Sequence, residues 1–455
     1  MTAPERRLAR GVVTRYAIGS VGTGGFATLP GLVLVFYLTD TLGVTALAAG
    51  IVVTAAKVWD VVVDPWIGER SDRALAVTGT RRTWMRVGAI ALPFAFAATF
   101  AVPLGLPPAA SGAWVFIAFL AAATAFSVFQ VPYIALPAEL TDDYDGRTRL
   151  LTWRVVVLSV AILLFGAGGP LLRRAGGDDE ALGYFVMAVV AGVLIGAGML
   201  VATTTAPRGA PSAAPPPRRL RDGYAEGLAA LRRSRPFRDL LAAFVLQGLA
   251  TGLMLAGANY VAARVLRSED ALTFLFVALI APAVVCAPLW GRLARRVGKE
   301  RGFALASVLF AVAAATLAGM LWAPGPWVYA PVALAGAAYA GMQSLPMAML
   351  PDVISHDARS HGDGRAGSFG GVWTAGETAG MALGATLLTI VLALTGYIES
   401  VGSTVVEQPP AAIAGIVVAF SLLPAGLVLL SLVPLARYPL RRGDVDADAA
   451  VAVPR

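Results

Sequence analysis

Long apolar stretches recur along most of the chain, and short polar or arginine-bearing loops separate them. A helix needs about 20 mainly apolar residues to cross a bilayer, so each stretch predicts a membrane-spanning helix. The pattern therefore predicts an all-α integral membrane protein with twelve transmembrane helices. The spans centre on residues 12–39, 44–67, 84–106, 111–137, 150–172, 182–204, 238–263, 271–291, 302–322, 326–350, 367–396 and 411–436.

Composition supports this class. Of the 455 residues 57% are hydrophobic and only 14% are charged, which is more apolar surface than a soluble domain could bury. The net charge of +8 comes almost entirely from arginine, since Lys57 and Lys299 are the only lysines. In a soluble protein such a charge would suggest a nucleic-acid partner. Here the arginines lie between apolar spans, so we expect a lipid bilayer as the partner and no nucleic acid.

The loops also predict an orientation. Those that follow even-numbered spans carry most of the arginines, as in ERSDRALAVTGTRRTWMR and GRLARRVGKERG, whereas TDTLGVT and LGLPPAAS carry none. By the positive-inside rule, both termini are cytoplasmic in a multi-pass protein of the cell (inner) membrane. The first apolar stretch lacks a cleavage pattern, so we expect a retained helix and not a signal peptide.

A Pro-, Ala- and Arg-rich loop divides the chain into halves. We expect an N-terminal six-helix half (1–206), a cytoplasmic linker (207–237), a C-terminal six-helix half (238–437) and a cytoplasmic tail (438–455). The halves repeat each other, because PWIGERSDR from Pro65 resembles PLWGRLARR from Pro288. Similarly, PYIALPAELTDD from Pro132 resembles PMAMLPDVISHD from Pro346. Two parallel halves favour a monomeric transporter with its small-molecule substrate at their interface.

Three charged residues interrupt the second span in the stretch KVWDVVVDPW. Lys57, Asp60 and Asp64 are spaced i, i+3 and i+7, which places them along one helix face. Placing an acidic residue at the centre of a membrane-spanning helix raises the free energy of membrane insertion by about 2.5–3.5 kcal/mol. The repeat places uncharged residues at the corresponding positions of the second half, so the fold does not require these charges. The counterparts are Ile280, Ala283 and Ala287.

Two carboxylates and one ammonium leave a net negative charge, which suits a proton or a monovalent cation. The hydroxyl of Ser127 or Thr124 could complete an oxygen cage. The alternative is a buried ion pair that locks helices together. A DxxxD pair also occurs in intramembrane prenyltransferases, which bind Mg²⁺ and a diphosphate. Those enzymes need a second aspartate-rich motif, and none lies within a span of this sequence.

Five segments resemble the glycoside–pentoside–hexuronide:cation symporters, the melibiose permease-like family of the major facilitator superfamily. They are KVWDVVVDPWIGERSDR, TGTRRTW, VPYIALPAELTDDYDGRTRLLTWR, LPDVISHD and GSFGGVWTAGETAGMALG. The resemblance implies the major facilitator fold and secondary active symport by alternating access. The cargo would be a small organic, sugar-like or altered solute, coupled to Na⁺ or H⁺. No other cofactor and no enzyme activity are implied. A related alternative is an exporter or a lipid or amphiphile transporter of the same fold.

The resemblance also implies roles for individual residues. Asp60 and Asp64 would bind the coupling cation, as metal ligands if it is Na⁺, together with Ser127 and Lys57. A cytoplasmic gating loop, with Gly79 in its turn, would hold one conformation through charge pairs that break in the other. The residues of that loop are Gly68, Asp72, Arg73, Arg81 and Arg82.

The substrate positions depart from the family. Where sugar-transporting relatives carry acids in the spans 12–39 and 111–137, this chain has Gly24 and Gln130. The expected lysine of the span 367–396 is replaced by Thr378, beside an unusual Glu377. Because carboxylates grip sugar hydroxyls through charge-assisted bonds, we expect a rebuilt substrate site. Further candidates are Tyr133, Arg154, Trp373 and Thr374, with Phe26, Trp153 and Tyr260 as possible pocket aromatics.

Two of these residues leave alternatives open. Glu377 could be a second protonation site, a contact for a cationic substrate, or an ion-pair partner of Lys57 or Arg154. Arg154 could contact substrate or the acids of the cation site, or it could extend to the cytoplasmic interface. His356 and His361, the only histidines, lie in a polar loop, so we expect no proton relay through histidine.

Overall fold

The computed structural model describes residues 9–141, 144–209, 229, 231–268, 270–361, 366–402 and 406–440. Most of the predicted linker and of the predicted tail lies outside these residues. The described chain is all-helical apart from its loops and one isolated β-bridge, between Leu42 and Val401. It divides into two compact units. Unit 1 comprises Met1–Arg218 with Glu399–Val406, and unit 2 comprises Arg219–Ile398 with Glu407–Arg455.

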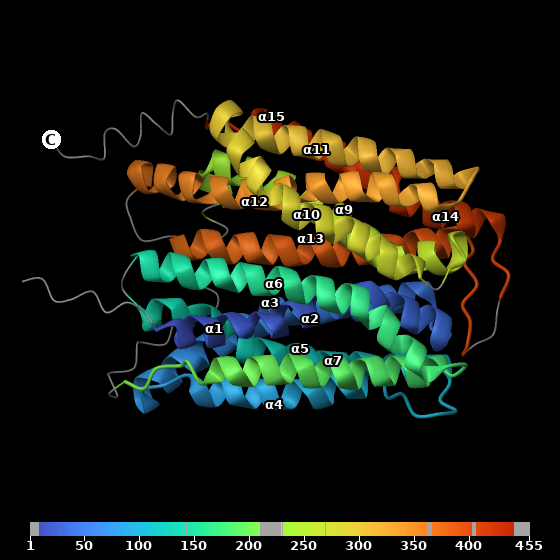
Figure 1. The fold of residues 1–455 in the computed structure, drawn as a ribbon, viewed down its shortest axis with the longest axis horizontal. Coiled ribbons are helices and arrows are strands. Elements are labelled where there is room, and N and C mark those ends of the chain that lie inside the picture. The colour runs from blue at the N-terminus through green and yellow to red at the C-terminus, as the bar shows by residue number, and fades with distance from the viewer. Residues whose placement is uncertain are drawn as a thin grey trace, which may run out of the picture. The chain divides into compact units, whose positions relative to one another are not determined.

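The long helices of each unit run in roughly one common direction (Figure 1). Those of unit 1 are α1 (Arg10–Ile18), α2 (Ser20–Phe36), α3 (Ala46–Thr78), α4 (Arg82–Thr99), α5 (Pro108–Leu140), α6 (Tyr144–Arg173) and α7 (Glu180–Thr203). The π-helical turn η1 (Tyr37–Thr41) extends α2, and the 3₁₀ turn η2 (Arg174–Gly176) follows α6.

Unit 2 is built in the same way. Its helices are α9 (Arg235–Tyr260), α10 (Ala271–Val297), α11 (Lys299–Thr316), α12 (Tyr329–His361), α13 (Ala366–Leu394), α14 (Pro410–Phe420) and α15 (Leu422–Arg437). Short turns continue three of them: η3 (Val261–Val265) after α9, η4 (Leu317–Leu321) after α11 and η5 (Pro326–Val328) before α12.

Helix pairing repeats between the units. In unit 1, α5 packs against α3 and α4, α2 packs against α6 and α7, and α4 packs against α7. In unit 2, α12 packs against α10 and α11, α9 packs against α13 and α15, and α11 packs against α15. The matching segments of the sequence repeat lie in equivalent helices, α3 with α10 and α5 with α12. The weak sequence repeat therefore corresponds to a repeated packing arrangement.

Ten helical segments of the described chain are long and apolar enough to cross a membrane. Two further helices, α4 and α12, occupy the other two predicted spans. Several helices continue past the apolar stretch that predicted them. For example, α3 runs to Thr78, eleven residues beyond the predicted span 44–67. Its intrahelical hydrogen bonds do not depend on apolar side chains, so a hydropathy pattern underestimates the length of such a helix.

The start of α3 is held by a segment from far along the chain. Glu399 Oε1 accepts a hydrogen bond of 2.9 Å from the Ala46 amide, one of the amides at the helix start that lack an intrahelical partner. Two further amides, of Ser400 and Gly402, donate to the carbonyls of Thr39 and Thr41 at 3.1 and 2.9 Å. Within unit 1 these contacts fix the end of the helix that carries the charged stripe.

Candidate functional site

The charged stripe lies on α3 in the predicted register. Lys57 Nζ contacts Asp60 Oδ2 at 3.1 Å, and their side chains are 34% and 16% exposed. This ion pair uses the single ammonium of the stripe. Asp64, one turn further along, therefore contributes a negative charge that no cation of the stripe balances.

Asp64 faces the neighbouring helix α5, where the hydroxyl of Ser127 lies within hydrogen-bonding reach of its carboxylate. Ser127 is buried. One carboxylate oxygen, Asp64 Oδ1, is buried and has no hydrogen-bond partner. A buried acceptor without a partner costs about 1–3 kcal/mol, and more when it is charged. The site therefore favours a bound proton or cation.

The structure distinguishes the two hydroxyls, Ser127 and Thr124, that the charge pattern by itself left as alternatives. Thr124 accepts a hydrogen bond of 2.9 Å from Trp59 Nε1 and donates one of 2.8 Å to the Leu120 carbonyl. It is thus engaged with the indole of Trp59, whereas Ser127 lies beside Asp64. The candidate cation site consists of the Asp60 and Asp64 carboxylates, with Ser127 as a neutral oxygen ligand and Lys57 as a competing cation.

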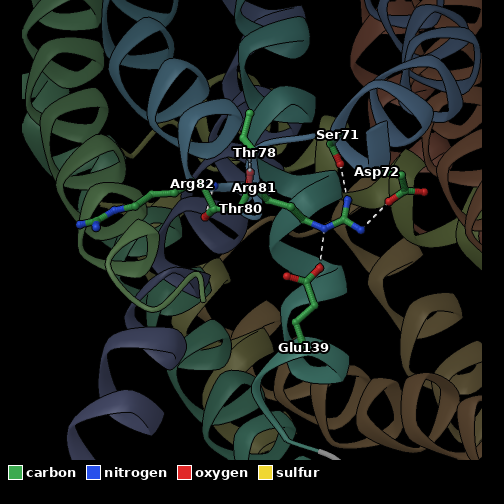
Figure 2. Close-up of polar contacts among 7 residues, drawn as sticks. All are labelled: Ser71, Asp72, Thr78, Thr80, Arg81, Arg82 and Glu139. Carbon is green, nitrogen blue, oxygen red and sulfur yellow. Dashed lines mark hydrogen bonds and ion pairs between the residues drawn. The ribbon is translucent and has the colours of Figure 1, made fainter. Parts of the chain in front are cut away.

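A second charged cluster, the Arg81 network, joins α3 to α5 near the start of α4 (Figure 2). Arg81 Nε donates to Glu139 Oε1 at 2.5 Å, and Nη1 donates to Ser71 Oγ at 2.5 Å. Its remaining nitrogen, Nη2, forms an ion pair with Asp72. Although Arg81 is only 8% exposed, three partners neutralise and orient its guanidinium.

Gly79 makes this network possible. It ends α3 in the left-handed region, with φ of 72°, and its amide donates to the Leu75 carbonyl at 2.8 Å. A Cβ at this position would lie 2.0 Å from the Gly209 carbonyl oxygen. Glycine is therefore required both for the backbone conformation and for space. The tight turn brings Arg81 back toward Asp72 on the preceding helix.

The remaining residues of the predicted gating loop do not belong to the Arg81 network. Arg73 pairs with Glu69 one turn away at 3.3 Å on an exposed surface. The side chain of Arg82 points away from the network (Figure 2). Gly68 lies on the α5 side of α3, where a Cβ would meet Val131 at an ordinary 3.6 Å.

Sequence reasoning missed Glu139. It lies in LPAEL, within a segment that carried the family resemblance, but its spacing from Arg81 gave no sign of contact. Unit 2 offered a signal, because Asp352 follows the equivalent Leu-Pro pair. There Lys299 Nζ contacts Asp352 Oδ2 at 2.5 Å. In each unit, a basic residue at the start of one helix, α4 or α11, thus pairs with an acid in the C-terminal part of the neighbouring helix, α5 or α12.

The Lys299–Asp352 pair borders a hollow of about 470 Å³ that is lined by α10, α11 and α12 and by Tyr438 and Leu440. None of the sequence-predicted site residues lines it. Its main neighbours are apolar side chains, and its four charged neighbours, Arg295, Lys299, Glu300 and Asp352, balance in sign. We therefore assign it no role in cation binding.

Two substrate candidates of unit 1 have defined hydrogen-bond partners. Gln130 Oε1 accepts from Thr23 Oγ1 at 2.8 Å, which links α5 to α2. Tyr133 is fully buried, and its hydroxyl donates to the Tyr16 carbonyl at 2.8 Å while lying 3.0 Å from Ser20 Oγ. These contacts give Tyr133 a structural role in the unit core.

Arg154 lies over the ring of Tyr133, with its guanidinium carbon 5.6 Å from the ring centroid. Its Nε is buried and lacks a hydrogen-bond partner. Within the described chain, no carboxylate forms an ion pair with it. Arg154 is thus held beside the buried tyrosine, and its Nε–H remains an unused donor.

Gly24 lies at a helix contact. A Cβ added there would be 2.8 Å from Ala161 Cβ and 3.1 Å from the Leu158 carbonyl oxygen, both on α6. The glycine therefore allows α2 and α6 to approach closely, and the space beside it is filled by another helix. An acid could not reach a solute from this position without displacing α6.

We expect Gly24→Ala to lower the stability of the protein. The added methyl group would overpack the contact with Ala161, at a cost of about 1–3 kcal/mol. Gly24→Asp should cost more, because it also buries a carboxylate. Thermal unfolding of the purified variants measures the effect. Gly11→Ala is the matched control, because a Cβ there would have no neighbour within 4 Å. Stable Gly24→Asp protein with improved sugar binding would contradict this assignment.

The candidates of unit 2 lie on α13. Trp373 is buried and stacks on Phe244 with ring centroids 4.3 Å apart, and its Nε1 has no hydrogen-bond partner. Thr374 donates to the Gly370 carbonyl at 3.1 Å. Glu377 and Thr378 are partly buried further along the helix. Among the other aromatics, Phe26 and Tyr260 are packed in the cores of their units and Trp153 is 52% exposed.

Comparison with known proteins identifies relatives. Residues 15–442 match the family described as MFS/sugar transport protein. An uncharacterized symporter of Synechocystis sp. is 34% identical over 162 residues, which are 34% of this chain and 28% of that protein. A glucuronide carrier protein homolog of Escherichia coli is 24% identical over 96% of this chain and 94% of its own length.

The length of the matched region varies among relatives. Four curated relatives, all named as symporters, are matched over only 28% to 40% of their own length. A solved structure of a D-xylose–proton symporter matches with a TM-score of 0.67 and 12% identity, over 94% of this chain and 98% of that chain. This likeness shows a common fold.

Proposed function

Because this multi-pass membrane protein belongs to the MFS/sugar transport protein family, a family of transporters and not of enzymes, we propose that it is a cation-coupled symporter. It carries a small organic solute together with Na⁺ or H⁺. Family membership also removes the prenyltransferase alternative for the Asp60–Asp64 pair.

The observation that carries the proposal is the state of Asp64. Lys57 already pairs with Asp60, Ser127 offers a neutral oxygen, and a buried oxygen of Asp64 has no partner. A site with one excess negative charge and one unused acceptor stabilises a proton or a small monovalent cation. Binding would neutralise the stripe and lower the cost of keeping it within the membrane.

We propose that the chain spans the membrane twelve times with both termini in the cytoplasm, in two six-helix halves. The repeated helix pairing and the arginine-bearing loops support this arrangement. Alternating access would then expose the solute and cation to each side in turn. The glucuronide carrier homolog and the D-xylose–proton symporter make a sugar-like solute the first class to test.

The Arg81 network would serve as the gate. It ties the end of α3 to the end of α5 through one guanidinium with three partners. Such a cluster stabilises the conformation in which its members are in contact. The loss of one partner therefore shifts the conformational equilibrium toward the alternative conformation.

Uptake into proteoliposomes that contain the purified full chain tests the proposed function. A sodium gradient and a pH gradient are imposed separately, and a panel of sugars, glycosides and hexuronides is offered. We expect one gradient to drive accumulation of a solute and an ionophore for that cation to abolish it. If a transported solute equilibrates but neither gradient concentrates it, cation coupling is wrong.

A further inference from the structure

Unit 2 contains a small polar niche between α9, α12 and α13. Its polar lining consists of Gln247, Thr251, Tyr339, Gln343 and Glu377. The accessible space is about 20 Å³, which holds one group of the size of a water molecule. A whole sugar does not fit, but the end of a solute or a small ion does.

The side-chain amide of Gln247 has a defined orientation. Its Nε2 lies 2.9 Å from Ser307 Oγ and 3.0 Å from Ser431 Oγ. Each serine hydroxyl donates its hydrogen to a backbone carbonyl of its own helix, at 2.8 and 2.6 Å. Both serines can therefore only accept from Gln247, so the NH₂ group faces them.

This orientation leaves an unused acceptor. Gln247 is 3% exposed, and its Oε1 is buried without a hydrogen-bond partner. The hydrogen of Thr251 is directed at the carbonyls of Gln247 and Gly248, at 3.0 and 3.1 Å. Gln343 Nε2 donates to the Tyr339 hydroxyl at 2.6 Å. The Thr251 hydrogen and one hydrogen of the Gln343 amide are thus already used, whereas the acceptor Gln247 Oε1 is not.

Glu377 adds a full negative charge to these acceptors. Among the residues that the structure describes, none forms an ion pair or a hydrogen bond with its carboxylate. Its position is fixed by close packing of α13 on α9, where Gly380 and Gly384 face the α9 backbone. A carboxylate held within an apolar bundle in this way needs a partner that brings positive charge and hydrogen-bond donors.

We propose that this niche binds a primary ammonium group, and that the group belongs to the transported solute; the second part rests on the function proposed above. An –NH₃⁺ group has three donors and no acceptor, which complements Glu377 and the orphan Gln247 Oε1. Its size fits the available space. The aromatic ring and the thioether sulfur beside the niche, from Phe244 and Met381, suit an organic cation better than a hard metal ion.

Binding of methylammonium to the purified full chain tests the site without requiring transport. The readout is the rise in thermal unfolding temperature as methylammonium replaces choline at constant ionic strength. We expect Glu377→Gln to weaken binding by at least about tenfold, because the charge-assisted bond is lost. Gln247→Met, which retains size but removes the orphan acceptor, should weaken binding by a smaller factor.

Two controls make the test specific. Glu407→Gln removes an exposed acid of unit 2 and should leave binding unchanged. Tetramethylammonium carries the same charge without N–H donors and should not bind.

Unaltered methylammonium binding by Glu377→Gln would overturn the proposal, and so would equally tight, Glu377-dependent binding of tetramethylammonium. Gradient-driven uptake is measured on the same preparations. If methylammonium binds in a Glu377-dependent way but no gradient drives uptake, the niche stands and cation coupling fails. If uptake is coupled but methylammonium does not bind, the niche fails alone.

Discussion

Replacing Asp64 by Asn is expected to abolish gradient-driven uptake, with a loss of about a hundredfold or more. The amide retains the size of the side chain and can still bond with Ser127, but it can neither hold a proton nor attract a cation. Hydrogen bonds to charged groups contribute about 1.5–3 kcal/mol. The loss of one charged ligand can therefore weaken cation binding by about the hundredfold expected for uptake. Initial rates of uptake into proteoliposomes measure the effect.

The fold of this variant should be preserved. Asp64 Oδ1 is buried without a partner, so removal of its charge removes an unfavourable burial and should not lower the unfolding temperature. Asp178→Asn is the matched control, since it removes an exposed carboxylate of the same unit. Retention of gradient-driven uptake by Asp64→Asn would place the coupling cation elsewhere.

Replacing Arg81 by Met should give the second large effect. The change leaves Glu139 and the buried Ser71 hydroxyl without their shared donor. We expect the free energy of unfolding to fall by about 2–3 kcal/mol. If the network stabilises one conformation of the transporter, the same energy shifts the conformational equilibrium by roughly a hundredfold. Thermal unfolding and hydrogen exchange of the α3–α4 turn measure the two consequences.

Arg82→Met provides a control with the same chemistry at the adjacent position, because its side chain points away from the network. A double-mutant cycle with Glu139→Gln adds a direct measure of coupling, since residues that share a hydrogen bond should not act additively. Equal effects of Arg81→Met and Arg82→Met, or additivity of Arg81→Met with Glu139→Gln, would contradict the role of the network.

Residues on one helix were the easiest to relate from the sequence. Lys57, Asp60 and Asp64 lie along one face because the helical period alone determines their spacing, and the Lys57–Asp60 contact follows from a separation of three residues. Hydropathy located the helical segments for a similar reason, since each span must satisfy its backbone hydrogen bonds internally. Helix ends were less predictable, because α3 continues as a polar helix.

Contacts between helices required the tertiary structure. The charge pattern alone left Ser127 and Thr124 as alternatives, and the family resemblance favoured Ser127. Only the packing of α5 on α3 shows that Ser127 lies beside Asp64 and Thr124 beside Trp59. Gly24 was interpreted as a missing acid, but it proved to be the point where α6 approaches α2. Glu139 gave only an indirect signal, through Asp352 after the equivalent Leu-Pro pair of unit 2, and the orphan oxygen of Gln247 gave none.

The amino-acid sequence determined the class of the protein, the helical segments, the internal repeat and the charged stripe, because each depends on local periodicity or on the cost of charge in a bilayer. The tertiary structure alone decided which side chains complete the stripe, which acid receives Arg81 and where Glu377 lies. Those outcomes depend on helix rotation and on approach distances, and small residues such as Gly24 and Gly380 set them. A shift of one residue in helix packing would change every such contact while leaving the hydropathy pattern intact.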